Sequence, residues 1–241
     1  MAFSIVATYL IFGLKKNNNY LLFLFWSTVF SYGFIRLIDL SSNRKTFKSY
    51  FYDYRFLFYG VLIFGFFSTL YYYFKLDYFT QIILIPLSLI TIAYQTQLRK
   101  NGIIKLLTVA FIWAMLVTVL PFDPKLVTIK LFIHFIYVFL YILLLTLSFD
   151  QRDILIDEPD LKTLPQLYPH KKQIIYLVLL TLFLTMNYFI FDTERVFVLS
   201  NMLILISIIL CFRSDNNKSF YYTAFWIEAL PIFWFLILKF L

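Results

Sequence analysis

Long apolar runs are the feature that most constrains what this 241-residue chain can fold into. A helix needs about 20 largely apolar residues to cross the hydrocarbon core of a bilayer. Nine apolar segments of roughly this kind alternate with short polar connections. They cover residues 1–14, 20–38, 54–75, 78–95, 103–121, 126–148, 173–191, 196–212 and 219–241. The pattern predicts an all-α, polytopic integral membrane protein with about nine transmembrane helices, of which the first is the shortest.

The composition excludes most soluble folds. The chain is 62% hydrophobic and only 14% charged, whereas soluble domains carry about 25% charged residues. No polar stretch is long enough to build a separate soluble domain, so we predict a single transmembrane domain over residues 1–241. The net charge of +8 arises mainly from short connections, which favours a role in membrane topology over nucleic-acid binding. One cysteine, Cys211, excludes an intramolecular disulfide.

The basic residues predict the orientation. With nine spans, the connections 39–53, 96–102, 149–172 and 213–218 lie on the same side. That side, helix ends included, holds fourteen of the 21 lysines and arginines, and the other side holds seven. The positive-inside rule places the richer side in the cytoplasm. We therefore expect a protein of the bacterial cytoplasmic (inner) membrane with its N-terminus in the cytoplasm.

Five of the 13 acidic residues fall within SFDQRDILIDEPDLKTLP, residues 148–165. Asp150, Asp153 and Asp157 are spaced i, i+3, i+7. If the helix of the sixth segment continues past the membrane edge, their carboxylates share one helical face. Clustered carboxylate oxygens suit Mg²⁺, which also bridges to substrate phosphates. The stretch therefore predicts a metal site, with a solvated acidic loop as the alternative.

Basic side chains flank these aspartates. Arg152, Lys162, Lys171 and Lys172 could serve as counter-charges to a diphosphate. The two adjacent lysines are better explained as topology signals. Asp160 completes the acidic stretch after a helix-ending proline.

The sequences RDILID (152–157) and DLKTLP (160–165) are similar to the second aspartate-rich motif of the UbiA superfamily of intramembrane prenyltransferases. Members of that family have nine transmembrane helices in a bundle around a central cavity. Their two aspartate-rich motifs lie at the cytoplasmic ends of helices 2 and 6. Here the motif follows the sixth apolar segment, so the resemblance agrees with the order of the segments.

The resemblance implies a Mg²⁺-dependent transfer of an isoprenyl group from a prenyl diphosphate to a lipid-soluble acceptor. Asp150, Asp153 and Asp157 would hold the metal on the diphosphate, and the last two would be the catalytic pair. Arg152 and Lys162 would contact the diphosphate. An allylic cation would then form in a dry cavity and be attacked by the acceptor.

The region of the first motif departs from the family pattern. Where an Asn-Asp-x-x-Asp-like sequence is expected, residues 31–39 read SYGFIRLID, so only Asp39 is acidic, with Asp53 further along. Tyr32, Arg36 and Asp39 share a helical face. Arg36 could bind a phosphate there or be an ordinary interfacial arginine. Loss of a single electrostatic group costs about 3–4 kcal/mol of transition-state stabilisation, so loss of most of this motif should slow the reaction strongly. The chain is therefore a slow enzyme, an enzyme with altered chemistry, or a binding protein.

Position alone makes four residues candidates, of which Tyr32 has already been named. Tyr32 and Trp113 could line a cavity through cation–π contacts, or simply pack or anchor at the interface. His134 and Glu228 are ionisable residues inside apolar segments. We predict a packed, hydrogen-bonded role for His134, whereas an intramembrane acid such as Glu228 is a functional candidate by default.

Three functions follow. The first is a UbiA-like prenyltransferase with a membrane lipid environment, a prenyl diphosphate and a lipophilic acceptor as partners. The second is a non-catalytic UbiA-fold protein that binds an isoprenoid or lipid diphosphate, because the first motif is degenerate. The third is an unrelated transporter or membrane scaffold.

Overall fold

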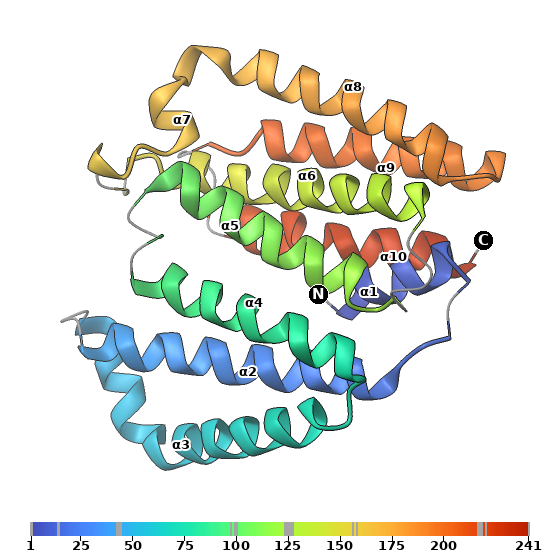
Figure 1. Cartoon of the computed structure of the whole chain (residues 1–241). Helices are drawn as coiled ribbons and strands as arrows, with labels where there is room; N and C mark the ends of the chain where they lie inside the picture. The colour runs from blue at the N-terminus through green and yellow to red at the C-terminus, as the bar shows by residue number, and fades with distance from the viewer. Residues whose placement is uncertain are drawn as a thin grey trace. The chain divides into compact units, whose positions relative to one another are not determined.

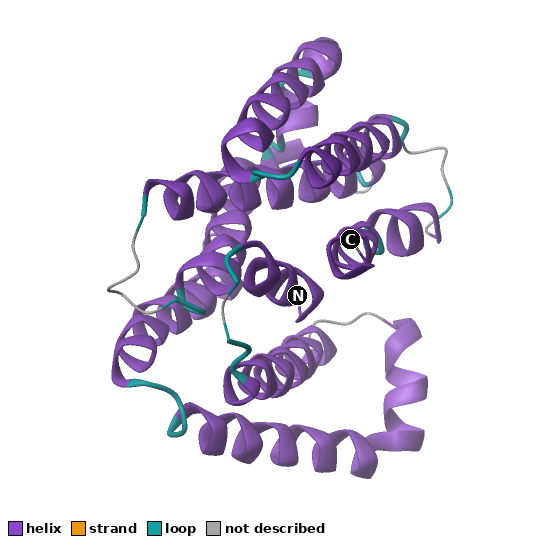
Figure 2. Cartoon of the chain, turned by 90° about the vertical axis from the view of Figure 1, so that its right-hand side faces the viewer, coloured by secondary structure: helices purple, strands orange, loops and turns teal. Residues whose placement is uncertain are grey.

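The computed structural model is helical wherever it has regular secondary structure (Figure 1), and Figure 2 shows no strand in the part of the chain that it describes. This confirms the all-α prediction. The backbone is described for residues 2–13, 15–41, 45–96, 98, 101–122, 128–155, 157, 159–215, 219 and 221–240. Within these ranges the side chains are described except at 2–3, 35–36, 38–41, 45–55, 95–96, 159 and 224.

Helices occupy all nine of the predicted apolar segments. They are α1 (Ala2–Ile11), α2 (Asn18–Ser41), α3 (Lys45–Tyr73), α4 (Tyr78–Thr96), α5 (Gly102–Ala114) continued by the π-helix η2 (Met115–Val119), α6 (Ile129–Arg152), α8 (Lys172–Ile190), α9 (Glu194–Phe212), and the π-helix η6 (Tyr222–Ile227) followed by α10 (Leu230–Phe240). Three short helices, η4 (Pro159–Leu161), α7 (Leu164–Leu167) and η5 (Pro169–Lys171), connect α6 to α8.

Five helical segments are long and apolar enough to cross a membrane. They are Phe56–Tyr73, Gly102–Val119, Ile129–Arg152, Pro169–Ile190 and Glu194–Phe212. The helices α1 and α10 have 10 and 11 residues. At about 1.5 Å per residue they reach roughly half the ~30 Å thickness of a bilayer core. Nine crossings therefore stay a prediction.

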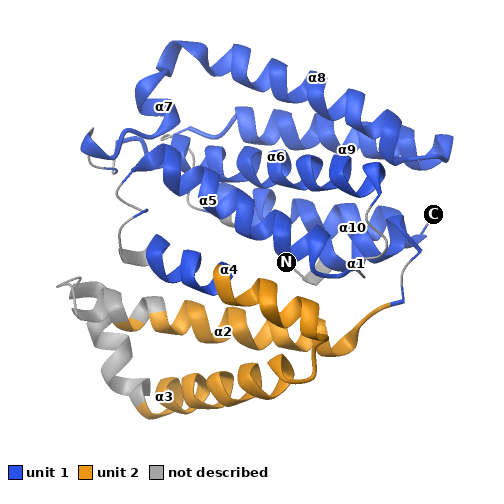
Figure 3. Cartoon of the chain, viewed as in Figure 1, with its two compact units in different colours: residues 1, 3–15, 87–241 blue, residues 2, 16–86 orange. Residues whose placement is uncertain are grey.

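The chain divides into two compact units (Figure 3), and the single transmembrane domain stays a prediction. Unit 1 comprises residues 1, 3–15 and 87–241, and unit 2 comprises residues 2 and 16–86. The division falls inside α4 at Pro86. A proline there lacks the N–H that would continue the helical hydrogen-bond ladder. Each unit is described by itself.

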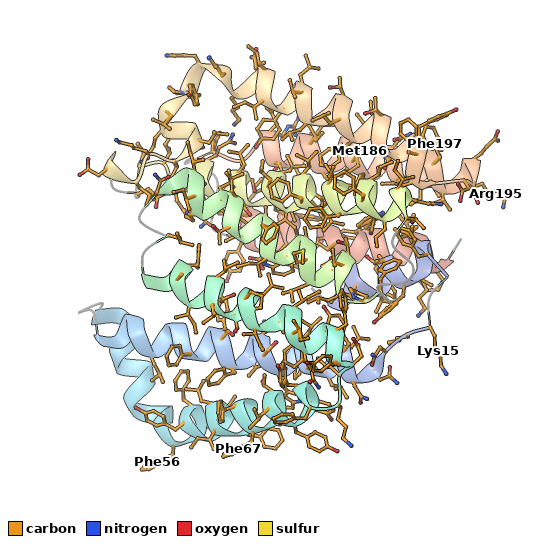
Figure 4. All side chains as sticks on the ribbon, in the orientation of Figure 1. Lys15, Phe56, Phe67, Met186, Arg195 and Phe197 are labelled. Carbon is orange, nitrogen blue, oxygen red and sulfur yellow. The ribbon has the colours of Figure 1, made fainter. Side chains whose placement is uncertain are left out.

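Unit 2 is built on α2 packed against α3. Gly65 lies beside Phe30 in this contact, and a Cβ added there would lie 3.6 Å from the Phe30 Cβ, an ordinary van der Waals distance. The outward side of α3 is aromatic. Phe56 and Phe67 are 80% and 62% exposed, and Figure 4 shows both side chains pointing outward from the helix. Such an apolar surface is typical of a helix that faces lipid.

The centre of unit 1 is α6, which α5, α8, α9 and η6 contact. In the membrane-crossing stretch of α6, 56% of the residues are buried, against 28–33% of the residues in the other segments of unit 1 that could cross a membrane. Thr128 begins the helix by accepting a hydrogen bond from the Leu131 N–H at 3.3 Å. Near that end, Lys130 Nζ forms an ion pair with Asp192 at 2.7 Å, in the turn between α8 and α9.

His134 lies fully buried in α6 and attaches α1 to it. Its Nε2 is 3.1 Å from the hydroxyl oxygen of Thr8 on α1. The rings of Phe12 and Tyr137 lie 5.3 and 6.3 Å from the imidazole. The prediction of a packed, hydrogen-bonded histidine is confirmed.

Candidate functional site

One end of unit 1 brings together the start of α5, the end of α6, the connection between α6 and α8, and the start of η6 (left-hand end of unit 1 in Figure 1). The first of these elements begins at Asn101, whose side chain accepts hydrogen bonds from the N–H groups of Ile103 and Ile104 at 3.1 and 3.2 Å. This N-cap fixes the first turn of α5, and that turn carries Lys105.

Gly102 lets the connecting segment pass directly over the start of α5. A Cβ at this position would lie 2.6 Å from Thr163 Cα, 2.7 Å from Thr163 N and 2.9 Å from the Leu161 carbonyl oxygen. All three are backbone atoms, so no side-chain rotation could make room. The connecting segment, which contains the end of the motif of residues 152–165, therefore packs directly on Gly102 of α5.

Asp150 forms a buried ion pair with Lys105. The Lys105 Nζ donates to Asp150 Oδ1 at 2.7 Å, and the side chain of Asp150 is 2% exposed. Its second oxygen, Oδ2, is buried and makes no hydrogen bond with any residue that the structure describes. Lys105 is also attracted by the charge of Asp157. The first predicted aspartate is therefore neutralised by a lysine from another helix.

Asp153 pairs with its own neighbour. Arg152 donates from Nε and Nη2 to the two carboxylate oxygens of Asp153, at 2.6 and 2.7 Å. Its Nη1 donates to the buried Thr223 hydroxyl at 2.6 Å, which connects the end of α6 to η6. The charge of Glu228, one residue beyond η6, also acts on Arg152. Glu228 is exposed in the structure, so its influence on Arg152 is one of charge alone.

The helix α6 ends at Arg152, so the condition for placing all three carboxylates on one helical face is not met. Asp153 adopts φ −89° and ψ 5° outside the helix, and its carboxylate turns back to Arg152. One further hydrogen bond has the i, i+4 spacing of an α-helix: the Asp157 N–H donates to the Asp153 carbonyl oxygen at 2.8 Å. Asp157 lies in this turn, yet the charges of Asp153 and Asp157 both act on Asp150. We call these three aspartates the acidic cluster.

Two members of the acidic cluster, Asp150 and Asp153, are each paired with a cation. Among the described residues no group of three or more His, Cys, Asp or Glu side chains is placed to hold a metal ion. Carboxylate oxygens suit Mg²⁺ chemically. A metal at Asp150 or Asp153 would compete with Lys105 or Arg152, so these carboxylates could hold Mg²⁺ once the two cations have changed partners. Mg²⁺ binding stays a prediction.

The other predicted site residues belong to several different elements. Asp160 and Lys162 are exposed on the connecting segment, and Lys162 has a positive φ of 53°. Trp113 is half-buried in the second half of α5. Tyr32, in unit 2, is exposed on α2. The side chains of Arg36, Asp39 and Asp53 lie outside the described residues. The structure therefore characterises the second motif and leaves the first as a prediction.

A cavity of about 190 Å³ lies beside the acidic cluster, within unit 1. It is lined by the ends of α6, α7 and α8 and by the segment after α9. Gln151 and Ile154 line it, and no member of the acidic cluster is among the described lining residues. The Tyr176 hydroxyl closes one wall, at 3.3 Å from Gln151 Oε1 and 3.2 Å from the Cys211 carbonyl oxygen.

Two interactions of the site were not anticipated from the sequence. Lys105 is one of the fourteen basic residues of the predicted cytoplasmic side, and neither it nor Thr223 is a site residue predicted from the sequence. A lysine one turn inside an apolar segment is itself a signal, because such a charge needs an acidic partner. The hydroxyl of Thr223 gives no comparable signal.

No family model matches the chain, and no curated protein or solved structure matches it either. The functional conclusions below accordingly depend on the motif in residues 152–165 and on the geometry of this end of unit 1.

Proposed function

We propose that the chain is an integral membrane prenyltransferase of the UbiA type, which transfers an isoprenyl group from a prenyl diphosphate to a lipid-soluble acceptor and requires Mg²⁺. The observation that supports this most is the meeting of the acidic cluster with Lys105 and Arg152 at one end of unit 1. In this proposal nine helices cross a bacterial inner membrane around a central cavity, and the site lies at the cytoplasmic surface.

The two cations define how a diphosphate would bind. Arg152 offers a planar fork that suits two phosphate oxygens, and Lys105 offers a compact charge with three donors. Both are occupied by carboxylates in the structure. Binding of a diphosphate would exchange these partners, because its oxygens compete with Asp150 and Asp153 for the same donors. Lys105 thereby joins Arg152 and Lys162 as a residue proposed to bind the diphosphate.

A non-catalytic lipid diphosphate-binding protein is the second candidate. The pairing of Asp150 with Lys105 and of Asp153 with Arg152 favours it, because these carboxylates are already neutralised. A transporter is less well supported. The acid that motivated it, Glu228, acts on Arg152 and so belongs to the same charged end of unit 1.

Turnover of a prenyl diphosphate by the purified full chain tests the proposal. We expect Mg²⁺-dependent release of diphosphate with farnesyl or geranylgeranyl diphosphate and a lipophilic acceptor, and loss of release with EDTA. Asp153→Asn and Asp157→Asn should each lower turnover by about 100-fold or more, the usual effect of removing one group that stabilises developing charge.

The matched control is Asp192→Asn, which removes a carboxylate at the opposite end of α6 and should leave turnover unchanged. Tight binding of the prenyl diphosphate without release would select the non-catalytic candidate. Turnover that survives in both variants of the acidic cluster would rule out its catalytic role.

A further inference from the structure

We propose that the cavity beside the acidic cluster is a second site, which binds the headgroup of a zwitterionic phospholipid with a primary ammonium group, as in phosphatidylethanolamine. The cavity is lined by the apolar side chains of Leu147, Ile154, Leu164 and Ile175 and by polar and charged residues, of which we call Tyr168, Lys172, Ser214 and Asp215 the rim. Its volume of about 190 Å³ equals that of about six water molecules at ~30 Å³ each. This is room for a small headgroup and not for a whole lipid.

The rim carries one charge of each sign. Lys172 and Asp215 both line the cavity, and each attracts the other electrostatically. The Lys172 Nζ donates to the Ser214 carbonyl oxygen at 3.0 Å and lies 4.9 Å from the centre of the Phe212 ring. An ammonium group has three donors, so Lys172 can also bind a phosphate oxygen. Asp215 can accept hydrogen bonds from a primary ammonium group.

This pair of charges discriminates between headgroups. A phosphatidylethanolamine headgroup presents a phosphate and an ammonium that can donate hydrogen bonds. The trimethylammonium of phosphatidylcholine has no N–H to offer Asp215, and phosphatidylglycerol has no cation at all. We therefore expect phosphatidylethanolamine to bind most tightly of the three lipids.

The polar wall of the cavity is held in place by hydrogen bonds between helices. The Ser214 hydroxyl donates to the Ser148 carbonyl oxygen at 2.7 Å, and the Tyr176 hydroxyl bridges Gln151 and Cys211. Three segments distant in the sequence thus hold the rim in one arrangement. A wall fixed before binding reduces the entropy lost when a ligand binds.

The position of the cavity suits a lipid headgroup. It lies where α6 ends, α8 begins and α9 ends, and all three belong to segments able to cross a membrane. The ends of such helices lie at headgroup depth. Tyr168, on the rim, is 44% exposed, and Lys171 Nζ lies 5.0 Å from its ring centre. Aromatic and basic side chains are typical of that depth. The inference rests on membrane insertion, as part of the proposed function, and not on prenyl transfer.

Native mass spectrometry of the purified full chain, titrated with phosphatidylethanolamine, phosphatidylcholine or phosphatidylglycerol, tests the site. We expect Asp215→Asn to weaken phosphatidylethanolamine binding about tenfold, because the amide oxygen still accepts a hydrogen bond but the negative charge opposite the ammonium group is lost. Lys172→Gln should weaken binding of both lipids, because both present a phosphate. Lys172→Arg should restore most of it.

The control variants are Lys130→Gln and Asp192→Asn, which change a lysine and an aspartate at the other end of α6. Neither control should change lipid binding. Ile154→Phe should reduce binding by filling the cavity without altering its charge, and thermal unfolding shows whether each variant is folded.

Three results would overturn the proposal: equal binding of the three lipids by the native chain, equal losses in the control variants, or soluble phosphoethanolamine competing as well as the lipid. Prenyl diphosphate turnover is measured on the same samples. If turnover is retained but phosphatidylethanolamine is not preferred, the lipid site alone is rejected. If phosphatidylethanolamine is preferred but no turnover is found, the transferase alone is rejected.

Discussion

The ion pair between Lys105 and Asp150 differs in kind from the pair between Lys130 and Asp192. Asp150 is 2% exposed, whereas Asp192 is 86% exposed, although both N···O distances are 2.7 Å. Exposed pairs contribute about 0–1 kcal/mol to stability. Removal of one partner from a buried pair leaves a charge without compensation and costs about 3–5 kcal/mol.

We therefore expect Lys105→Met to lower the free energy of unfolding by about 3–5 kcal/mol, measured by denaturation of the purified chain in detergent. Lys130→Met should cost less than about 1 kcal/mol. The double variant Lys105→Met/Asp150→Leu should recover much of the loss, because it removes the stranded carboxylate. An equal cost for the two single variants would contradict the buried pair.

At the scale of elements, the contact between α5 and the connecting segment depends on Gly102. We expect Gly102→Ala to displace the backbone of Thr163 and Leu161 and to cost about 1–3 kcal/mol, as overpacking usually does. Because this segment belongs to the proposed site, turnover should also fall, by about 100-fold for a displacement near 1 Å.

Gly60, in α3, is the matched control for this substitution, since a Cβ added there meets nothing within 4 Å. Gly60→Ala should leave turnover unchanged and raise stability by about 0.5–1 kcal/mol, because alanine favours a helix over glycine. Similar losses in both variants would show that the close approach at Gly102 has no special role.

The sequence predicts the helices better than their contacts. Apolar runs and polar breaks are local features, and helices lie in all nine predicted segments. The contacts of the site join residues far apart in the chain. Lys105 and Asp150 are 45 positions apart, and Arg152 and Thr223 are 71 positions apart. Local spacing cannot show such pairs, because they arise only when the helices pack. The early end of α6 is a local event, in which Asp153 leaves the helix and its carboxylate turns back to its neighbour Arg152.

At the scale of the whole molecule, the predicted orientation can be tested with single cysteines. The native Cys211 is fully buried, so it should give little background. We expect Asn17→Cys to react with a membrane-impermeant maleimide in intact cells. Lys162→Cys should react only after the membrane is permeabilised, because its connection lies on the cytoplasmic side. The reverse pattern would invert the proposed topology and place the acidic cluster outside the cell.

The most direct test of a prenyl diphosphate site at the acidic cluster is a crystal structure of the full chain with Mn²⁺ and a non-hydrolysable prenyl thiodiphosphate. We predict an anomalous Mn²⁺ peak within coordination distance of Asp153 or Asp157, with thiodiphosphate oxygens on Lys105 and Arg152 in place of their carboxylate partners. A metal peak and a thiodiphosphate bound away from all these residues, with both ion pairs intact, would contradict the proposed site.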